Sequence, residues 1–226
     1  DAVHSGAAQL IIGTHALIQK TVQFHTLALA IIDEQHRFGV AQRQALLAKA
    51  PRMPHLLSMT ATPIPRSLQL TVFGELDISI LDELPAGRKP IVTKLWAQTN
   101  TAALYQAIDD QLTQGRQAYI ICRLIDENPD NDTKSVEAEY NRLKSTIFRH
   151  RRIGVLHGGM LPADKDAVMA EFVAGKLDIL VSTTVVEVGV NVPNASVILI
   201  ENADHFGLSQ LHQLRGRVGR GDHQSY

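Results

Sequence analysis

The chain has 226 residues, a formal net charge of −1 and 45% hydrophobic and 20% charged residues, values that exclude disorder of the whole chain. A charge this small also excludes binding to nucleic acid through overall charge, so such contacts would need local basic patches. The single cysteine, Cys122, excludes an internal disulfide and favours a reducing, cytoplasmic location. Because no apolar run approaches the ~20 residues that span a bilayer, we expect no membrane partner.

Before residue 80, short apolar segments alternate with segments of helical spacing. Three runs without polar alternation predict strands buried on both faces of a sheet: 8–14, 27–34 and 55–62. Helices are predicted at 40–50, which ends before a proline, and at 63–74, which begins with prolines and ends at a glycine. The tract DELPAGRKP, residues 82–90, combines proline, glycine and charge and indicates a domain boundary.

The same alternation returns after this boundary. Five further strands are predicted: 91–96, 117–125, 152–158, 177–184 and 195–202. Four helices are predicted between and after them: 100–115, 134–150, 161–175 and 207–218. Residues 126–133 are expected to form an exposed polar loop. Repeated βα units predict an α/β protein with two parallel-sheet domains in tandem, the first incomplete.

We place the first domain at residues 1–84, a linker at 85–90 and the second domain at 91–226, truncated at its end. The first residues have neither the basic start nor the apolar core of a signal peptide. An initiator methionine is also missing, and the chain stops soon after a glycine-rich turn. We therefore expect a fragment of a longer protein.

Two adjacent carboxylates, Asp33 and Glu34, follow the apolar run of the strand predicted at 27–34. They suit either an ordinary strand end or the carboxyl edge of a parallel sheet, where α/β proteins bind ligands. At such an edge Asp33 could hold Mg²⁺ while Glu34 deprotonates an attacking water. His36 leaves a metal-only hydrolase as a rival interpretation, although its spacing matches no zinc pattern such as HExxH.

The segment HQLRGRVGRG, residues 212–221, alternates arginines with glycines. Glycines let a backbone approach phosphate closely, and guanidinium groups bind phosphate oxygens in pairs. The alternative is a solvated basic surface. Phosphate binding is favoured because these glycines would weaken an ordinary surface helix.

Hydroxyl side chains follow two further predicted strands. Ser58, Thr60 and Thr62 precede prolines, which is typical of a helix cap and turn, with a functional site as the alternative. In STTVVEVGVNVPNAS, residues 182–196, a hydroxyl cluster is followed by a Pro-Asn turn. This segment suits either a clamp on a nucleic-acid backbone or a structural turn.

Seven segments together resemble the superfamily 2 helicases, in the order of that family and from Gly13 to Gly221. They are GTHALI, DEQHRFGVAQR, MTATPIPRSL, DELPAGRKPI, HGGM, STTVVEVGVNVPNA and ENADHFGLSQLHQLRGRVGRG. The resemblance implies an ATP-dependent DNA helicase with two RecA-like motor domains and with ATP and Mg²⁺ as cofactors.

Within that family, DELPAGRKPI and Gln35 favour the bacterial branch that remodels stalled forks and recombination junctions in DNA repair and recombination. ADHFGL and DHQSY are closer to the branch that couples transcription to repair. A non-catalytic module that binds DNA or a partner through a degenerate motor fold is the third reading. The DEQH and RGRVGR segments argue against it.

The resemblance assigns nucleotide chemistry by position. Asp33 and Glu34 would be the Mg²⁺-binding and water-activating carboxylates of a DExH box. Gln35 and His36 would sense the nucleotide state across a cleft between the motor domains. The residues that match the last helicase motif are Gln213, Arg217 and Arg220, and its two arginines would stabilise charge on the ATP phosphates. Two residues of the 182–196 segment would also bind the nucleotide: Gly189 and Asn191.

The resemblance assigns DNA contacts as well. Three residues would link hydrolysis to DNA movement: Thr60, Ala61 and Thr62. Seven residues would hold the DNA backbone: Gly13, Thr14, His157, Gly158, Ser182, Thr183 and Thr184. The implied partner is branched double-stranded DNA, such as forks and Holliday junctions, bound largely without sequence specificity. Single-stranded-DNA-binding protein as a second partner, a monomeric state and the bacterial cytoplasm are further implications.

Three departures from the family pattern bear on these roles. The GxxxxGK[ST] loop is absent from the chain and in this family precedes residue 1, as does a wedge-like DNA-binding region. We therefore expect the full-length protein to hydrolyse ATP and the chain alone not to. Asn191 stands where the family usually has aspartate, which bears on the coupling role of its loop. Gly159 stands where arginine is common, which bears on one backbone contact.

Overall fold

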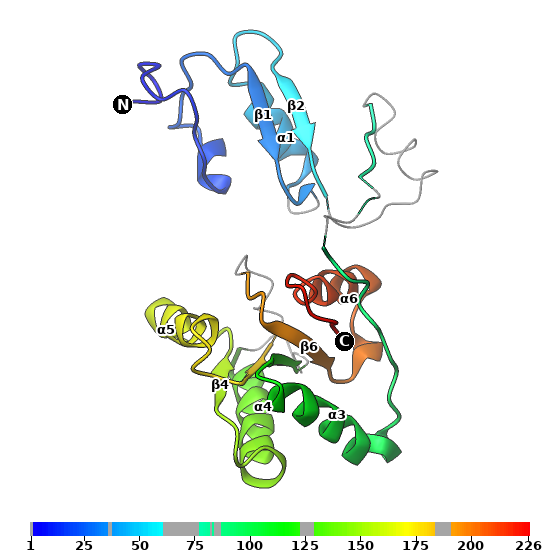
Figure 1. Cartoon of the computed structure of the whole chain (residues 1–226). Coiled ribbons are helices and arrows are strands. Elements are labelled where there is room, and N and C mark those ends of the chain that lie inside the picture. The colour runs from blue at the N-terminus through cyan, green and yellow to red at the C-terminus, as the bar shows by residue number, and fades with distance from the viewer. Residues whose placement is uncertain are drawn as a thin grey trace. The chain divides into compact units, whose positions relative to one another are not determined.

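The computed structural model describes residues 2–35, 38–60, 77–81, 83, 87–122, 129–183 and 191–226. The chain divides into two compact units, Asp1–Leu76 and Asp77–Tyr226, which we call the N-terminal and C-terminal units (Figure 1). The division falls before the linker predicted at 85–90. Five predicted site residues lie outside the described residues: His36, Ala61, Thr62, Thr184 and Gly189. The helix predicted at 63–74 lies outside them as well.

The described part of the N-terminal unit forms a βαβ crossover. Its elements are the 3₁₀ helix η1 (His15–Ile18), β1 (Leu29–Ile32), α1 (Val40–Leu47) and β2 (His55–Ser58). β1 and β2 pair in parallel, with Leu29 opposite His55 and Ile32 opposite Ser58. The strands predicted at 27–34 and 55–62 and the helix at 40–50 are therefore confirmed, each shorter than predicted. Parallel neighbours need such a crossover, and α1 supplies it here.

Two expectations for this unit were wrong. Residues 8–14 form no strand, and Leu10 and Ile12 are 80% and 89% exposed. A strand needs a partner for its backbone groups, and among the described residues β1 and β2 pair only with each other. β1 is not buried on both faces, because Ala30 and Ile32 are buried while the alternate residues are half-exposed.

In its described residues, the C-terminal unit forms a four-stranded parallel sheet with helices. Its helices are η3 (Gln98–Asn100), α3 (Thr101–Thr113), α4 (Pro129–Arg142) with the π-helical turn η4 (Leu143–Ile147), α5 (Pro162–Val173), η6 (Ala203–His205) and α6 (Leu208–Arg215). Its strands are β3 (Gln117–Ile121), β4 (Ile153–Leu156), β5 (Ile179–Ser182) and β6 (Ala195–Ile200). The spatial order is β4-β5-β3-β6, and all three pairings are parallel. The predicted parallel-sheet α/β class is confirmed.

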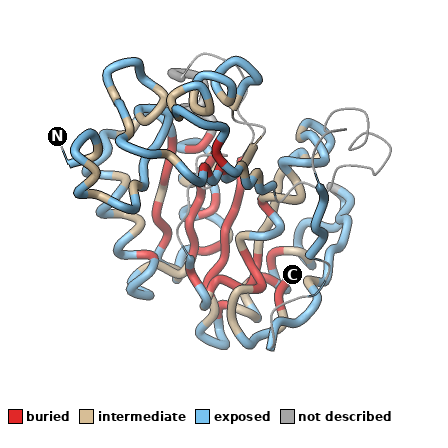
Figure 2. Tube along the Cα trace, turned by 90° about the horizontal axis from the view of Figure 1, so that it is seen from above, coloured by how far each residue is buried: buried red, intermediate tan, exposed pale blue. Residues whose placement is uncertain are grey.

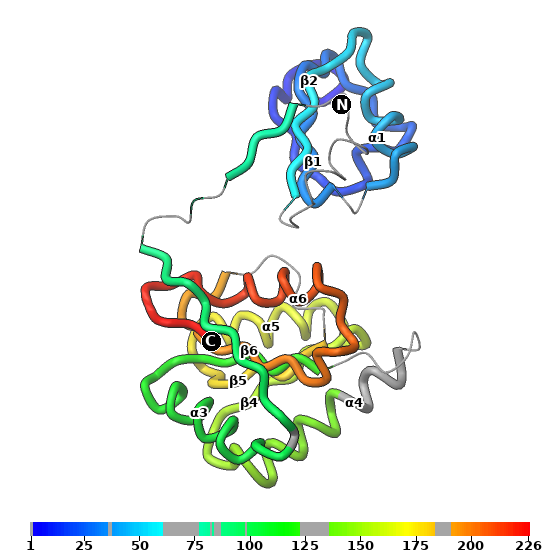
Figure 3. Tube along the Cα trace, turned by 90° about the vertical axis from the view of Figure 1, so that its right-hand side faces the viewer, coloured from blue at the N-terminus to red at the C-terminus, as the bar shows by residue number. Residues whose placement is uncertain are grey.

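Helices cover both faces of this sheet. α3 and α4 lie on one side of the strands, and α5 and α6 lie on the other (Figure 3). The first layer buries Ile108 and Leu143 against the sheet, and the second buries Phe172 and Leu214. The central strands β3 and β5 are buried at every position (Figure 2). Burial on both faces explains why their sequences run apolar without alternation.

Two further predictions in this unit were wrong. Residues 91–96 form no strand, although the Val92 N–H donates to the Ser225 carbonyl at 2.9 Å. The edge of β6 is instead bonded by Tyr226, whose N–H donates to the Ser196 carbonyl at 2.8 Å. The loop predicted at 126–133 is helical from Pro129 onward, because proline suits a first helical turn. No helix in the described part of the chain has both the length and the apolar character for crossing a bilayer.

Replacing Phe172 by alanine should destabilise the C-terminal unit by about 3–5 kcal/mol. Phe172 is fully buried on α5 and packs against Tyr119 with ring centroids 5.1 Å apart, so truncation leaves a cavity. Urea unfolding followed by the fluorescence of Trp96, the single tryptophan, measures the change. Val173→Ala is the matched control, because Val173 is next in sequence and half-exposed. Equal effects of the two variants would contradict the assigned core.

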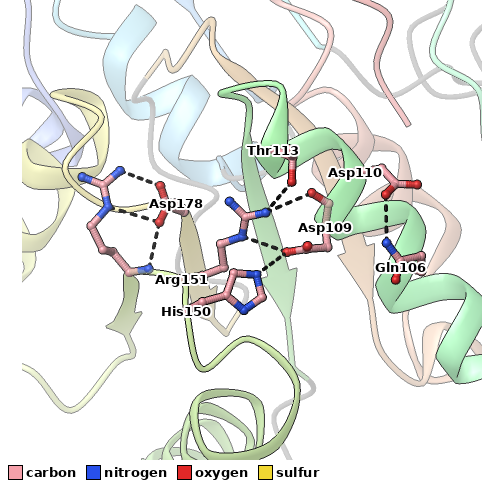
Figure 4. Close-up of polar contacts among 8 residues, drawn as sticks. Gln106, Asp109, Asp110, Thr113, His150, Arg151 and Asp178 are labelled. Atoms are coloured by element: carbon pink, nitrogen blue, oxygen red, sulfur yellow. Dashed lines mark hydrogen bonds and ion pairs between the residues drawn. The ribbon is translucent and has the colours of Figure 1, made fainter.

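At the amino end of the sheet, ion pairs join α3 to the loop that precedes β4 (Figure 4). Arg151 Nε donates to Asp109 Oδ1 at 2.8 Å, and Arg151 Nη2 donates to Thr113 Oγ1 at 2.6 Å. His150 Nε2 lies 3.1 Å from the same Asp109 oxygen. The hydrogen bond from Arg151 is the main cause that lowers the pKa of Asp109.

Because the pKa of Asp109 is lower in the folded state, its contribution to stability is present above the ordinary value of 3.8 and is lost as pH falls further. We expect Asp109→Asn to cost about 1–3 kcal/mol at pH 7 and progressively less toward pH 3. Urea unfolding at several pH values measures this. Asp110→Asn is the control, since Asp110 is exposed and accepts a hydrogen bond from Gln106. A cost for Asp109→Asn that does not change with pH would contradict the assignment.

Candidate functional site

Asp33 and Glu34 lie directly after β1, at the carboxyl end of the β1–β2 pair. Asp33 is exposed and Glu34 is partly buried. The Glu34 N–H donates to Asp33 Oδ1 at 2.9 Å, and Glu34 has a φ of +49°. A left-handed conformation costs a residue with a Cβ on the order of 1–3 kcal/mol, so the surrounding structure must hold this turn.

Backbone hydrogen bonds tie this turn to the end of β2. The Met59 N–H donates to the Ile32 carbonyl at 2.8 Å, and the Gln35 N–H donates to the Met59 carbonyl at 3.1 Å. The structure thereby brings the carboxylate segment beside Thr60, the described residue of the predicted coupling motif. Chemically, an exposed carboxylate at a strand end fits a Mg²⁺ ion that keeps most of its ligands as water and phosphate oxygens.

Gly13 and Thr14 lie at the start of η1. Thr14 Oγ1 accepts a hydrogen bond from the Ala16 N–H at 3.5 Å and caps this short helix. The ring of His15 stacks on Phe38, with centroids 4.2 Å apart and planes 12° apart. Because Phe38 follows the DEQHR segment, the structure brings the start of η1 to the loop beyond the carboxylates.

In the C-terminal unit, glycines end α6 and set the course of the arginine segment. α6 stops at Arg215, earlier than the predicted end at 218, and Gly219 has a φ of +74°. Only glycine adopts that conformation without cost. The Gly219 N–H donates to Ser225 Oγ at 3.1 Å. The Arg220 Nε donates back to the Gly216 carbonyl at 3.0 Å.

Arg217 and Arg220 are both partly buried and lie close enough to Tyr119 of β3 to act on it electrostatically. Burial raises the pKa of Tyr119 to about 12, and the two guanidinium groups oppose this shift. The structure therefore gathers both predicted arginines on the α6 side of the sheet. Gln213 lies one turn earlier, within α6. Such a pair of guanidinium groups can bind an anion such as phosphate.

The HGGM and STT segments meet at the carboxyl end of the sheet. Leu156 pairs with Ser182, and the Thr183 N–H donates to the Leu156 carbonyl at 3.3 Å. His157, which follows β4, lines a surface pocket of about 430 Å³ between α4 and α5. The side chains of Ser182 and Thr183 are buried, whereas Gly158 is exposed.

Asn191 is exposed and precedes β6. In the described ranges, no three or more His, Cys, Asp and Glu side chains are grouped so that they could hold a metal ion. Sequence reasoning missed one polar cluster at the carboxyl end of the sheet: Tyr105, Glu139, Arg142 and Glu201. Its members come from three elements, and no motif signals their proximity.

A parallel sheet with helices on both faces and polar motifs at its carboxyl ends is the architecture of a nucleotide-binding α/β domain. The helicase conserved C-terminal domain family matches residues 99–222, and the chain belongs to this family. It is also similar to the ATP-dependent DNA helicase RecG, with 55% identity to the Bacillus subtilis protein and 51% to that of Escherichia coli K12. Each alignment covers 98% of this chain and 32% of the relative, so the chain spans about a third of these relatives.

Solved structures show the same fold. A structure of RecG bound to a three-way DNA junction matches with a TM-score of 0.70 and 44% identity, over 97% of this chain and 28% of that chain. Dbp5 of Saccharomyces cerevisiae bound to RNA and ADP BeF3 matches with a TM-score of 0.64 and 16% identity, over 96% of this chain and 58% of that chain, which shows the fold alone. The predicted resemblance to superfamily 2 helicases is confirmed, and the bacterial branch that DELPAGRKPI and Gln35 favour is that of RecG.

Proposed function

We propose that the chain belongs to an ATP-dependent DNA helicase of the RecG type, which remodels branched DNA in repair and recombination. The observation that supports this most strongly is the 51–55% identity to RecG proteins across nearly the whole chain. The N-terminal unit would be the later part of the first motor domain and the C-terminal unit most of the second. A monomer in the bacterial cytoplasm, with single-stranded-DNA-binding protein as a second partner, is part of this proposal.

In this proposal both units serve ATP hydrolysis. Asp33 would hold Mg²⁺, and Glu34 would orient an attacking water and accept its proton. Mg²⁺, when bound, offsets the negative charge of the phosphates. Arg217 and Arg220 stabilise the charge that develops on the transferred phosphoryl group. The other nucleotide-responsive residues are Gln35, His36, Gly189, Asn191 and Gln213.

The remaining motif residues serve DNA. Thr60 lies beside the carboxylate turn, which supports a role for it and its neighbours Ala61 and Thr62 in linking hydrolysis to movement. The DNA backbone is held by Gly13, Thr14, His157, Gly158 and the segment 182–184. Since Ser182 and Thr183 are buried, we expect backbone groups rather than their hydroxyls to make this contact. Contacts of this kind carry no sequence code.

Strand separation by the full-length protein tests the proposal. With ATP and Mg²⁺ we expect a labelled strand to be released from a three-way junction, and much less release from a linear duplex of the same length. Omitting ATP should stop release, and the 226-residue chain alone should not hydrolyse ATP. Tight junction binding without turnover would instead indicate a non-catalytic module. Equal activity on linear duplex, with displacement of a stalled polymerase, would indicate a transcription-repair coupling factor.

A further inference from the structure

A cluster of ionisable side chains lies at the carboxyl end of the C-terminal sheet, apart from every role proposed above. Glu201 directly follows β6, and its N–H donates to the Ile121 carbonyl at 3.0 Å. Glu139 and Arg142 come from α4, and Tyr105 comes from α3. Three elements therefore converge on Glu201.

Arg142 donates most of its hydrogen bonds to groups other than Glu201. Its Nε and Nη2 donate to the two oxygens of Glu139 at 2.8 and 2.5 Å, and Nη2 also donates to the Tyr105 hydroxyl at 2.5 Å. Arg142 Nη2 lies 3.6 Å from Glu201 Oε1. The Tyr105 hydroxyl donates to Glu201 over a long 3.4 Å. One guanidinium thus pairs closely with one of two carboxyl groups.

Both carboxyl groups face the same guanidinium nitrogen, because Arg142 Nη2 lies 2.5 Å from Glu139 Oε1 and 3.6 Å from Glu201 Oε1. Two carboxylates that share one site repel each other, so one of the two favours keeping its proton where water is largely excluded. The side chains of Glu139 and Glu201 are only 13% and 27% exposed. With one proton the cluster is neutral, whereas with two carboxylates and one guanidinium it carries a net negative charge that little water can screen.

We propose that Glu139 and Glu201 hold one proton between them, and that loss of this proton loosens the packing of α4 on the sheet. α4 is the element expected to loosen, because Glu139 is on α4 while Glu201 is at the end of β6. Val136 of α4 and Leu143 just after it are fully buried in the core layer that also contains Cys122. Repulsion between the carboxylates therefore acts across the interface that buries these side chains.

The direction of the pH effect follows from the pKa of Glu201. Burial raises this pKa, and the charge of Glu139 raises it further, while Arg142 and the bond from Tyr105 oppose the shift. A carboxyl pKa raised by folding gives stability that is fully present below the unfolded value and is lost as pH rises through the folded value. α4 should therefore pack most tightly in mild acid.

Cys122 supplies the readout. It is the single cysteine, it is 4% exposed, and it follows β3 beside the cluster, so a thiol reagent reaches it only when this layer opens. We would measure its labelling by 4,4′-dithiodipyridine from pH 5 to 8.5, in the 226-residue chain and in its Glu201→Gln variant. In the opened state the thiol is in solvent in both proteins, so the ratio of their rates reports opening alone.

We expect similar labelling rates at pH 5 and faster labelling of the unsubstituted chain as pH rises. Each unit by which folding raises the pKa corresponds to about a tenfold ratio at high pH. Glu171→Gln, at an exposed position of α5, is the matched control and should leave the rate unchanged. A ratio that is constant with pH, or faster labelling of Glu201→Gln at pH 8, would overturn the proposal.

A second measurement keeps the test decisive if Glu201→Gln folds poorly. The ¹³C chemical shift of the Glu201 side-chain carboxyl, titrated in the unsubstituted chain, reports its protonation directly. A midpoint above those of exposed glutamates such as Glu171 supports the shared proton. A midpoint equal to theirs or below them means that Glu201 is ionised beside Arg142, and the proposal fails.

Discussion

Glu34→Gln in the full-length protein is expected to abolish ATP turnover while leaving ATP binding intact. The amide has almost the same shape as the carboxylate but cannot accept a proton from water, and a positioned base contributes about 10²–10⁴-fold. The turn should persist, because its backbone bonds join Gln35, Met59 and Ile32 and do not involve the Glu34 side chain. Steady-state phosphate release measures turnover, and titration with a fluorescent ATP analogue measures binding.

The matched control is Glu171→Gln, the same chemical change at an exposed position of α5. It should leave both turnover and binding unchanged. If Glu34→Gln retains hydrolysis within a few-fold of the unsubstituted protein, Glu34 is not the base. If it loses nucleotide binding as well, the left-handed turn, rather than the proton transfer, depends on the carboxylate.

In the full-length protein, Arg217→Ala and Arg220→Ala should each lower the rate constant of ATP hydrolysis by about 10³–10⁵-fold. This is the range for arginines that stabilise phosphoryl transfer. Lysine should rescue poorly at either position, because a compact ammonium cannot bind two phosphate oxygens as the planar guanidinium does. Single-turnover hydrolysis separates this loss from changes in nucleotide affinity.

The control for the arginines is Arg149→Ala, an exposed arginine just before β4 whose side chain donates to the Ser145 carbonyl. Full activity is expected from it. Removing Arg220 also removes its bond to the Gly216 carbonyl, which is worth about 1 kcal/mol of stability. Thermal unfolding of each variant shows whether lost activity reflects lost folding. Near-normal hydrolysis by folded Arg217→Ala and Arg220→Ala would contradict their assignment.

Sequence patterns predicted the elements well where local preference and burial agree. β3 and β5 are apolar except for Gln117 and Ser182 at their ends and are covered on both faces, as predicted. The segments 8–14 and 91–96 are also rich in apolar residues but form no strand. A strand requires an edge to pair with, and in the C-terminal unit β6 is bonded by Tyr226 instead of by 91–96. Composition cannot reveal this competition, because it depends on which segments reach the edge.

The sequence by itself determined the α/β class, the order of the motifs and the residue types for phosphate and metal chemistry, because local spacing encodes these. Only the tertiary structure decided which of those residues are neighbours. The register of β1 on β2 brings Thr60 to the carboxylate turn, and the packing of α3 and α4 brings Tyr105, Glu139 and Arg142 to Glu201. Such contacts depend on burial between distant segments, so the charge that surrounds Glu201 follows from the fold and cannot be read from its neighbours in the chain.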